Sequence, residues 1–198
     1  MPSALPISLH RLRIPFLSSL ILGLLAYGFA ITNKLVNHDE VFTLFFKGGT
    51  FSLGRWGLAI LELIFPNYSM PWIYGIITVV LVAAAVCMMV SLFGIRNRLL
   101  QARLGGTVMV FPSLIGLFGY MFTSASFGLS FFLAVLSVKL IQKPKFRYLL
   151  AAGACLVLSL SIYQSYISVA ASLLVLLLIL GKVMKSRKAK KKGTVREA

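Results

Sequence analysis

The sequence predicts an all-α, polytopic membrane protein with about six transmembrane helices, and three observations lead to this prediction. The chain has 198 residues, of which 59% are hydrophobic, and its mean hydropathy is +0.94. The apolar residues form long runs, several of them close to the roughly 20 residues that a helix needs to cross a bilayer. The 20 basic residues face only 4 acidic ones and gather in short clusters between these runs, giving a formal charge of +16. This pattern excludes an ordinary soluble domain, and it favours topology signals and lipid headgroup contacts over nucleic-acid binding.

The apolar runs give the expected spans in order. The first four lie at residues 14–32, 72–95, 105–122 and 125–141. The last run, residues 148–180, would measure roughly 50 Å as one helix, which is well beyond a single crossing of the bilayer. One long helix and two short crossings that turn within residues 161–166 are therefore the alternatives.

The basic residues favour two crossings, because cytoplasmic loops of membrane proteins carry the excess of Lys and Arg. With Arg11 and Arg13 inside, the basic clusters at 96–103, 139–147 and 182–196 all fall inside only if residues 148–180 cross twice. We therefore expect six spans with cytoplasmic ends, a transmembrane domain over residues 1–181 and a basic cytoplasmic tail over residues 182–198.

The external loop at residues 33–71 is the longest one under this topology. Its charges balance, because Lys34, Lys47 and Arg55 face Asp39, Glu40 and Glu62. Residues 53–68 are apolar at helical spacing, and this pattern stops before Pro66, so they predict a helix lying at the outer interface or dipping into it.

The stretch NHDEVF in this loop puts two of the four acidic residues, Asp39 and Glu40, side by side. A carboxylate at the outer end of a membrane helix ordinarily marks the water interface, but the neighbouring His38, Lys47 and Arg55 favour a functional site. Adjacent residues on a helix point about 100° apart, so we expect one carboxylate to face a cavity and the other to brace the loop. Consecutive side chains do not converge on one ion, so no metal or other cofactor is predicted.

One carboxylate is enough for one class of sugar chemistry. A sugar on a lipid phosphate has a leaving group that is already a stable anion, so a single base for the acceptor hydroxyl suffices, whereas a glycosidase needs two flanking carboxylates. Arg55 or Lys47 would stabilise the negative charge that grows on the phosphate as the bond breaks. The alternative explanation for both residues is anchoring at the membrane interface.

Other polar and aromatic residues have two interpretations each. Trp56 is either part of the outer aromatic belt or a platform for sugar stacking. The stretch SIYQSYIS holds Tyr163, Gln164 and Tyr166 between apolar halves, and these side chains either form a hydrogen-bonded turn or contact a sugar.

The order of NHDEVF, SLGRWG and LSIYQSYIS along the chain resembles the GtrII family of bacterial membrane glucosyltransferases, which look like GT-C type enzymes. The resemblance implies transfer of a glucosyl group from a polyprenyl-phosphate donor to O-antigen or a related surface polysaccharide, at the periplasmic face of the bacterial inner membrane. It implies Asp39 as the general base with Glu40 beside it. Substrate-binding candidates are then Lys47, Arg55, Trp56, Tyr163, Gln164 and Tyr166.

The resemblance covers only the N-terminal part of such enzymes, since family members continue through further spans. The alternative to a hexosyltransferase is therefore a nonenzymatic or truncated membrane subunit that completes a longer transferase, as a partner subunit or in an oligomer. A carrier for a lipid-linked sugar ranks last, because it predicts ionisable groups near the bilayer midplane and the acidic residues lie in loops, at span ends or in the tail.

Overall fold

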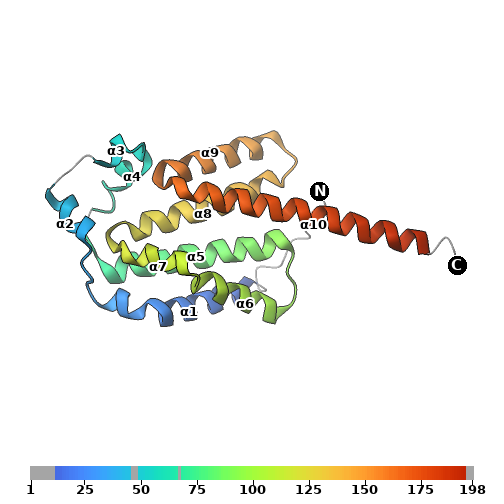
Figure 1. Cartoon of the computed structure of the whole chain (residues 1–198), viewed down its shortest axis with the longest axis horizontal. Coiled ribbons are helices and arrows are strands. Elements are labelled where there is room, and N and C mark those ends of the chain that lie inside the picture. Colours follow the sequence, from blue (N-terminus) through green and yellow to red (C-terminus); the bar gives the residue numbers. More distant parts are fainter. Residues whose placement is uncertain (1–11, 46–48, 67, 195–198) are drawn as a thin grey trace.

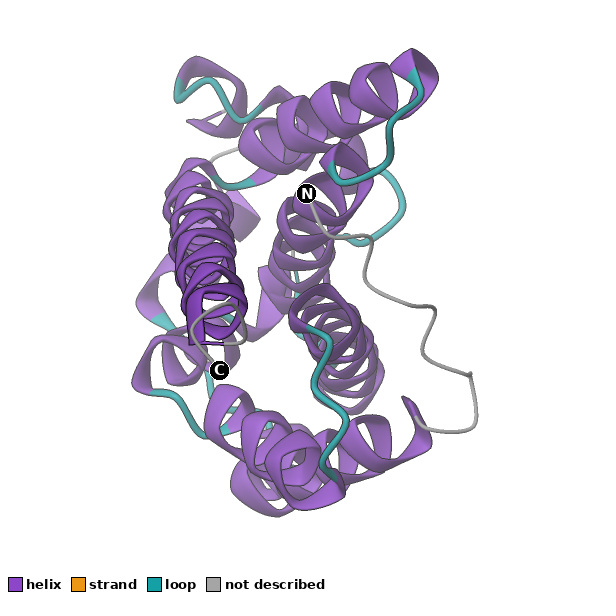
Figure 2. Cartoon of the chain, turned by 90° about the vertical axis from the view of Figure 1, so that its right-hand side faces the viewer, coloured by secondary structure: helices purple, strands orange, loops and turns teal. Residues whose placement is uncertain are grey.

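The structure is a computed structural model that describes residues 12–45, 49–66 and 68–194. It is a bundle of helices joined by short connections, and the described residues contain no strand (Figures 1 and 2). In chain order the elements are α1 (Arg13–Thr32), α2 (His38–Phe45), α3 (Gly49–Ser52), α4 (Trp56–Leu61), α5 (Pro71–Phe93), α6 (Arg98–Met109), α7 (Pro112–Gly119), η2 (Met121–Thr123), α8 (Ser124–Ile141), α9 (Phe146–Ile162), η3 (Gln164–Tyr166) and α10 (Ile167–Thr194).

Four segments of the described chain are long and apolar enough to cross a membrane: α1, α5, Met121–Ile141 and Gln164–Val183. The pair α6 and α7 meets the same criteria together but is bent by 48°. Helix α9 is apolar and 17 residues long, or about 25 Å, which is short of the roughly 30 Å hydrocarbon core. The described residues confirm the prediction of a helical protein with helices long and apolar enough to span a membrane, and the number of six crossings stays a prediction.

The expected span at residues 105–122 differs from the structure, where α6 begins earlier and a bend separates it from α7. Pro112 occupies the first turn of α7, and Phe111 before it is extended, with φ −66° and ψ 134°. Proline has no N–H to donate and disfavours a helical residue before it, so one continuous helix is broken here. The hydroxyl of Tyr27 donates to the Met109 carbonyl at 2.7 Å, which ties α1 to the end of α6 at this bend.

Residues 148–180 do not form one long helix. Tyr163 is extended, with φ −148° and ψ 107°, and the chain reverses direction between α9 and α10 (Figure 1). Helix α9 is held on α8 by two reciprocal hydrogen bonds of 2.8 Å, from the Ser130 hydroxyl to the Ser159 carbonyl and from the Ser159 hydroxyl to the Ser130 carbonyl. Such hydrogen bonds between small residues are typical of helix contacts within membranes.

Helix α5 lies at the centre of the bundle, between α1 and α8. Tyr74, Val79 and Val82 are at most 1% exposed. Small residues let the neighbouring helices approach: a Cβ on Gly75 would lie 2.5 Å from the Ile31 side chain, and a Cβ on Gly128 would lie 3.3 Å from the Thr78 backbone.

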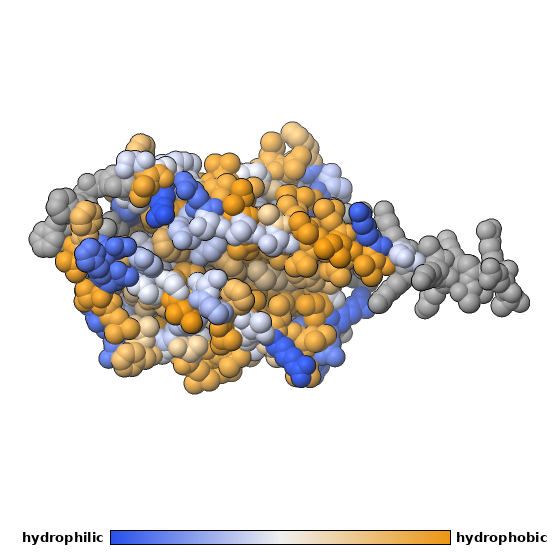
Figure 3. Space-filling view, viewed as in Figure 1, coloured by the Kyte–Doolittle hydropathy of each residue, from blue (hydrophilic) through white to orange (hydrophobic). Residues whose placement is uncertain are grey.

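The two ends of the bundle hold different elements and connections. Helices α2, α3 and α4 lie at the end where α9 joins α10, whereas the connections before α6 and between α8 and α9 lie at the other end (Figure 1). Hydrophobic residues cover much of the visible surface between the ends (Figure 3). The loop at residues 33–71 differs from its prediction, because the helix expected from residue 53 up to Pro66 is limited to α4. A turn at Gly54 precedes α4, and tight turns follow it to Phe65.

Candidate functional site

The acidic pair lies in the first turn of α2, and Asn37 fixes how this helix starts. The Asn37 side-chain oxygen accepts the Asp39 backbone N–H at 3.0 Å, as an N-cap residue does, and its amide nitrogen donates to the Gly119 carbonyl at 2.9 Å. Carboxylates are favourable in the first turn because the helix dipole is positive there. Asn37 therefore joins the start of α2 to the end of α7.

Glu40 is buried, with 2% of its surface exposed. Its Oε1 atom accepts the Ser69 backbone N–H at 2.7 Å and lies 3.5 Å from the Lys34 ammonium. Ser69 is two residues before α5 begins, so Glu40 joins the start of α2 to the segment that leads into the central helix. A buried carboxylate with a backbone donor and a cationic neighbour is a bracing group.

Asp39 has the opposite environment. Its side chain is 56% exposed, and its Oδ1 atom lies 3.7 Å from Nδ1 of His38, which is itself 92% exposed. The carboxylate is therefore open to a molecule that approaches this end of the bundle, while its backbone is held by the Asn37 cap.

Arg55 follows a tight turn. Gly54 has φ +74°, in the left-handed region that glycine adopts without strain, and the Arg55 N–H donates to the Thr50 carbonyl at 3.1 Å. The Arg55 guanidinium carbon lies 5.2 Å from the centre of the Tyr163 ring, within range of a cation–π contact. Its Nε atom is buried and has no hydrogen-bond partner among the described residues. Arg55 therefore keeps donor capacity for an acceptor that a bound group would bring.

The polar stretch after α9 forms an aromatic cluster around Tyr163. The Tyr163 ring lies 4.5 Å from the Phe127 ring and 5.2 Å from the Tyr166 ring, measured between centroids. The Tyr166 ring also packs edge-on against Phe131 at 5.6 Å. These contacts fix the face on which the Arg55 guanidinium rests.

Two further contacts dock the α3–α4 segment on this cluster. The Gln164 side chain donates to the Leu53 carbonyl at 3.2 Å, and Gly57 lies directly against the Ser161 side chain. A Cβ on Gly57 would overlap the Ser161 hydroxyl and lie 3.0 Å from the Ser161 Cβ. The close approach therefore requires glycine at position 57.

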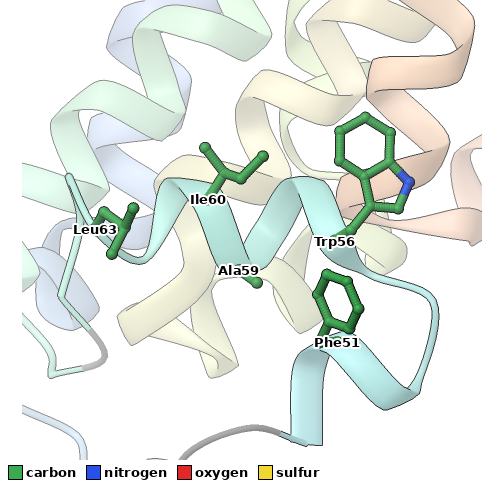
Figure 4. A pocket seen from close by; sticks show the side chains of 5 residues that line it. All are labelled: Phe51, Trp56, Ala59, Ile60 and Leu63. Atoms are coloured by element: carbon green, nitrogen blue, oxygen red, sulfur yellow. The ribbon is translucent and has the colours of Figure 1, made fainter.

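Trp56 lines an open apolar groove of about 410 Å³ together with Phe51, Ala59, Ile60 and Leu63 (Figure 4). The rings of Phe51 and Trp56 come from α3 and α4, and Trp56 is 39% exposed. A groove with this lining fits hydrocarbon better than a sugar hydroxyl.

The structure brings together one subset of the predicted residues and separates it from another. Arg55, Tyr163, Gln164 and Tyr166 belong to one contact network. Trp56 is the first residue of α4, which packs on α9. Asp39 and Glu40 lie at the same end of the bundle on α2, and their contacts described above are with other residues (Figure 1). Lys47 lies outside the described residues.

Sequence reasoning missed the residues that hold the site in place. The role of Asn37 as an N-cap could have been predicted, because an Asn directly before His38 and Asp39 is typical of a helix start. The roles of Ser69 and Gly57 could not, since their contacts are with residues distant in the chain. Glu62 accepts a hydrogen bond from the Thr50 hydroxyl at 3.0 Å. Among the described residues no three His, Cys, Asp or Glu side chains are grouped to hold a metal ion.

Comparison with known proteins gives one result. The model of the family described as Glucosyl transferase GtrII matches residues 28–197, which include the acidic pair, the GRW element and the YQSY element. No curated protein and no solved structure matches the chain.

Proposed function

Since the chain belongs to the glucosyl transferase GtrII family, we propose that it transfers a glucosyl group from a polyprenyl-phosphate donor to O-antigen or a related surface polysaccharide, with Asp39 as general base. The observation that carries this proposal is the division of the acidic pair. Glu40 is buried and bonded, whereas Asp39 is held by its backbone and open on its side chain. An exposed carboxylate on a fixed backbone suits a base that meets an acceptor hydroxyl.

In the proposed reaction the acceptor oxygen bonds to the anomeric carbon as the bond from that carbon to the donor phosphate oxygen breaks. The hydroxyl proton passes to the Asp39 carboxylate, and the electron pair of the broken bond leaves with the polyprenyl phosphate. Arg55 stabilises the growing phosphate charge, and its unpartnered Nε supports this role. Neither a metal nor another cofactor is required.

The remaining candidates have supporting roles in this proposal. The apolar groove beside Trp56 accepts the first part of the polyprenyl chain, because its lining is hydrocarbon. Tyr163 and Tyr166 position Arg55, and Gln164 holds the turn in front of it. Lys47 is proposed as a second phosphate contact on its sequence position alone.

The proposed topology has six crossings in the bacterial inner membrane, with the acidic pair on the periplasmic face. It is supported by the placement of α2–α4 and the α9–α10 junction at one end of the bundle (Figure 1). At the opposite end lie the connections that carry Arg96, Arg98, Lys143 and Lys145, as cytoplasmic loops do.

The test replaces Asp39→Asn and follows glucose incorporation into cell-surface polysaccharide at matched membrane levels of the protein. Loss of incorporation is expected, because the amide has no basic oxygen for the hydroxyl proton. Glu62→Gln is the control, since it makes the same chemical change in the same loop and keeps an acceptor for Thr50.

Unchanged incorporation with Asp39→Asn would contradict the base assignment. An equal and small effect of both substitutions would favour the nonenzymatic subunit that completes a longer transferase, because such a subunit does not use its carboxylate chemically.

A further inference from the structure

The connection between α8 and α9 gathers basic side chains at the end of the bundle opposite α2–α4 (Figure 1). Lys143, Lys145 and Arg147 are all exposed, and Lys139 on the last turn of α8 donates to the Ser91 hydroxyl at 2.7 Å. We call Lys139, Lys143, Lys145 and Arg147 the basic cluster. The proposed transfer reaction uses none of its residues.

Two of these cations share one aromatic ring. The Lys143 ammonium lies 4.3 Å and the Arg147 guanidinium carbon 5.0 Å from the centre of the Tyr148 ring, and Arg147 also donates to the Tyr148 hydroxyl at 3.4 Å. Two like charges at one ring repel each other, and an anion between or beside them would offset this repulsion.

The described part of the chain offers this cluster no counter-charge. Its carboxylates are Asp39, Glu40 and Glu62, which lie in α2 and directly after α4, at the opposite end of the bundle (Figure 1). The two ion pairs found among the described residues are those of Lys34 with Glu40 and His38 with Asp39. The basic cluster therefore matches an anion from outside the described residues.

The neighbourhood of the cluster indicates which anion. Phe146, Leu149 and Leu150 on the first turns of α9 are 69%, 54% and 60% exposed. A soluble anion gains nothing from this apolar strip, whereas a phospholipid places a phosphate directly above hydrocarbon. Because α9 is only about 25 Å long, its basic start lies within reach of the headgroup layer or draws headgroups toward it.

We propose that the basic cluster and Tyr148 form a binding site for the phosphate headgroup of an anionic phospholipid, whose acyl chains lie along the exposed apolar side of α9. Lys143 and Arg147, which both lie close to the Tyr148 ring, contact the phosphate. The tyrosine holds them in place at the level where aromatic rings accumulate in membranes.

The test uses the purified full chain in a neutral detergent and measures retained lipid by native mass spectrometry. Phosphatidylglycerol and phosphatidylcholine with identical acyl chains are titrated separately. We expect phosphatidylglycerol to be retained about tenfold more strongly. Addition of inorganic phosphate should not displace it, because free phosphate lacks the acyl chains.

The matched variants are Lys143→Gln/Arg147→Gln at the α8–α9 junction and Arg96→Gln/Arg98→Gln at the α5–α6 junction. They remove equal charge at the same end of the bundle (Figure 1). The affected side chains are exposed, so both variants should unfold thermally like the original chain. We expect the first variant to lose the preference for phosphatidylglycerol and the second to keep it. Equal loss in both variants, equal retention of both lipids, or displacement by inorganic phosphate would each overturn the proposal.

Discussion

Gly57→Ala tests whether the docking of α4 on α9 matters for the proposed transfer reaction. The new Cβ would overlap the Ser161 hydroxyl and lie 3.0 Å from the Ser161 Cβ and 3.2 Å from its backbone carbonyl carbon. Overpacking of this kind costs about 1–3 kcal/mol. If the cost falls on docking alone, the ratio of docked to undocked molecules drops by roughly 5- to 150-fold, because about 1.4 kcal/mol corresponds to a factor of ten.

The loss should appear in activity more than in global stability. Helix α4 lies at one end of the bundle, so its displacement leaves the α1–α5–α8 core intact but moves Arg55 away from the Tyr163 ring. We therefore expect a strong fall in glucose incorporation, with little change in thermal unfolding of the purified protein in detergent.

Two further variants make this reasoning refutable. Ser161→Gly removes both side-chain atoms that the new Cβ meets, so Gly57→Ala/Ser161→Gly should recover much of the incorporation. Gly153→Ala adds the same methyl group on α9, where nothing lies within 4 Å, and should be neutral. Full activity of Gly57→Ala, or failure of the second substitution to restore any activity, would refute the argument.

Three other predictions concern buried hydrogen bonds and the proposed topology. Glu40→Ala leaves the Ser69 N–H without its acceptor and should lower the free energy of unfolding by about 1–3 kcal/mol. Glu40→Gln keeps an acceptor oxygen and should lower it less. Equal losses in the two variants would contradict the bracing role. Tyr27→Phe keeps the stacking on Phe118 but removes the hydrogen bond to Met109. Thermal unfolding should therefore show a loss of about 0.6–1.7 kcal/mol in the free energy of unfolding. Tyr68→Phe, at an exposed position, should leave the free energy of unfolding unchanged. After replacement of Cys87 and Cys155 by Ala, an impermeant thiol reagent should label Leu53→Cys in intact cells and Lys143→Cys only in permeabilised ones; the reverse pattern would contradict the proposed topology.

The positions of most helices could be predicted from the sequence, because lipid-facing helices require long apolar runs whatever their partners. The run at residues 14–32 corresponds to α1, and the run at 72–95 corresponds to α5 within two residues at each end. The bend at Pro112 was also readable in principle, since proline breaks a helix by its own geometry. Apolar composition alone did not reveal the bend, because hydropathy does not depend on the backbone N–H that proline lacks.

Contacts of the site could be predicted only where they are local. The polar break at Tyr163 and the acidic helix start after Asn37 are both visible in short stretches of sequence. The sequence could not show which of the two adjacent carboxylates is buried, because this depends on the Ser69 N–H, 29 residues further along the chain. The approach of Gly57 to Ser161 likewise depends on how two distant segments meet.

The separate anchoring of Asp39 and Arg55 agrees with the chemistry proposed for them. In the proposed transfer the base acts on the acceptor hydroxyl, while the arginine acts on the leaving phosphate, so the two groups belong on different sides of the anomeric carbon. Asp39 is fixed through Asn37 and Glu40 to α7 and the start of α5, and Arg55 is fixed through Tyr163 and the Gly57 contact to α9. Because the anchors are different helices, a substitution that loosens one group leaves the other in place. Displacement of Arg55 should therefore weaken the stabilisation of the leaving phosphate and leave the Asp39 carboxylate in place, and this is why Gly57→Ala and Asp39→Asn test the two ends of one reaction.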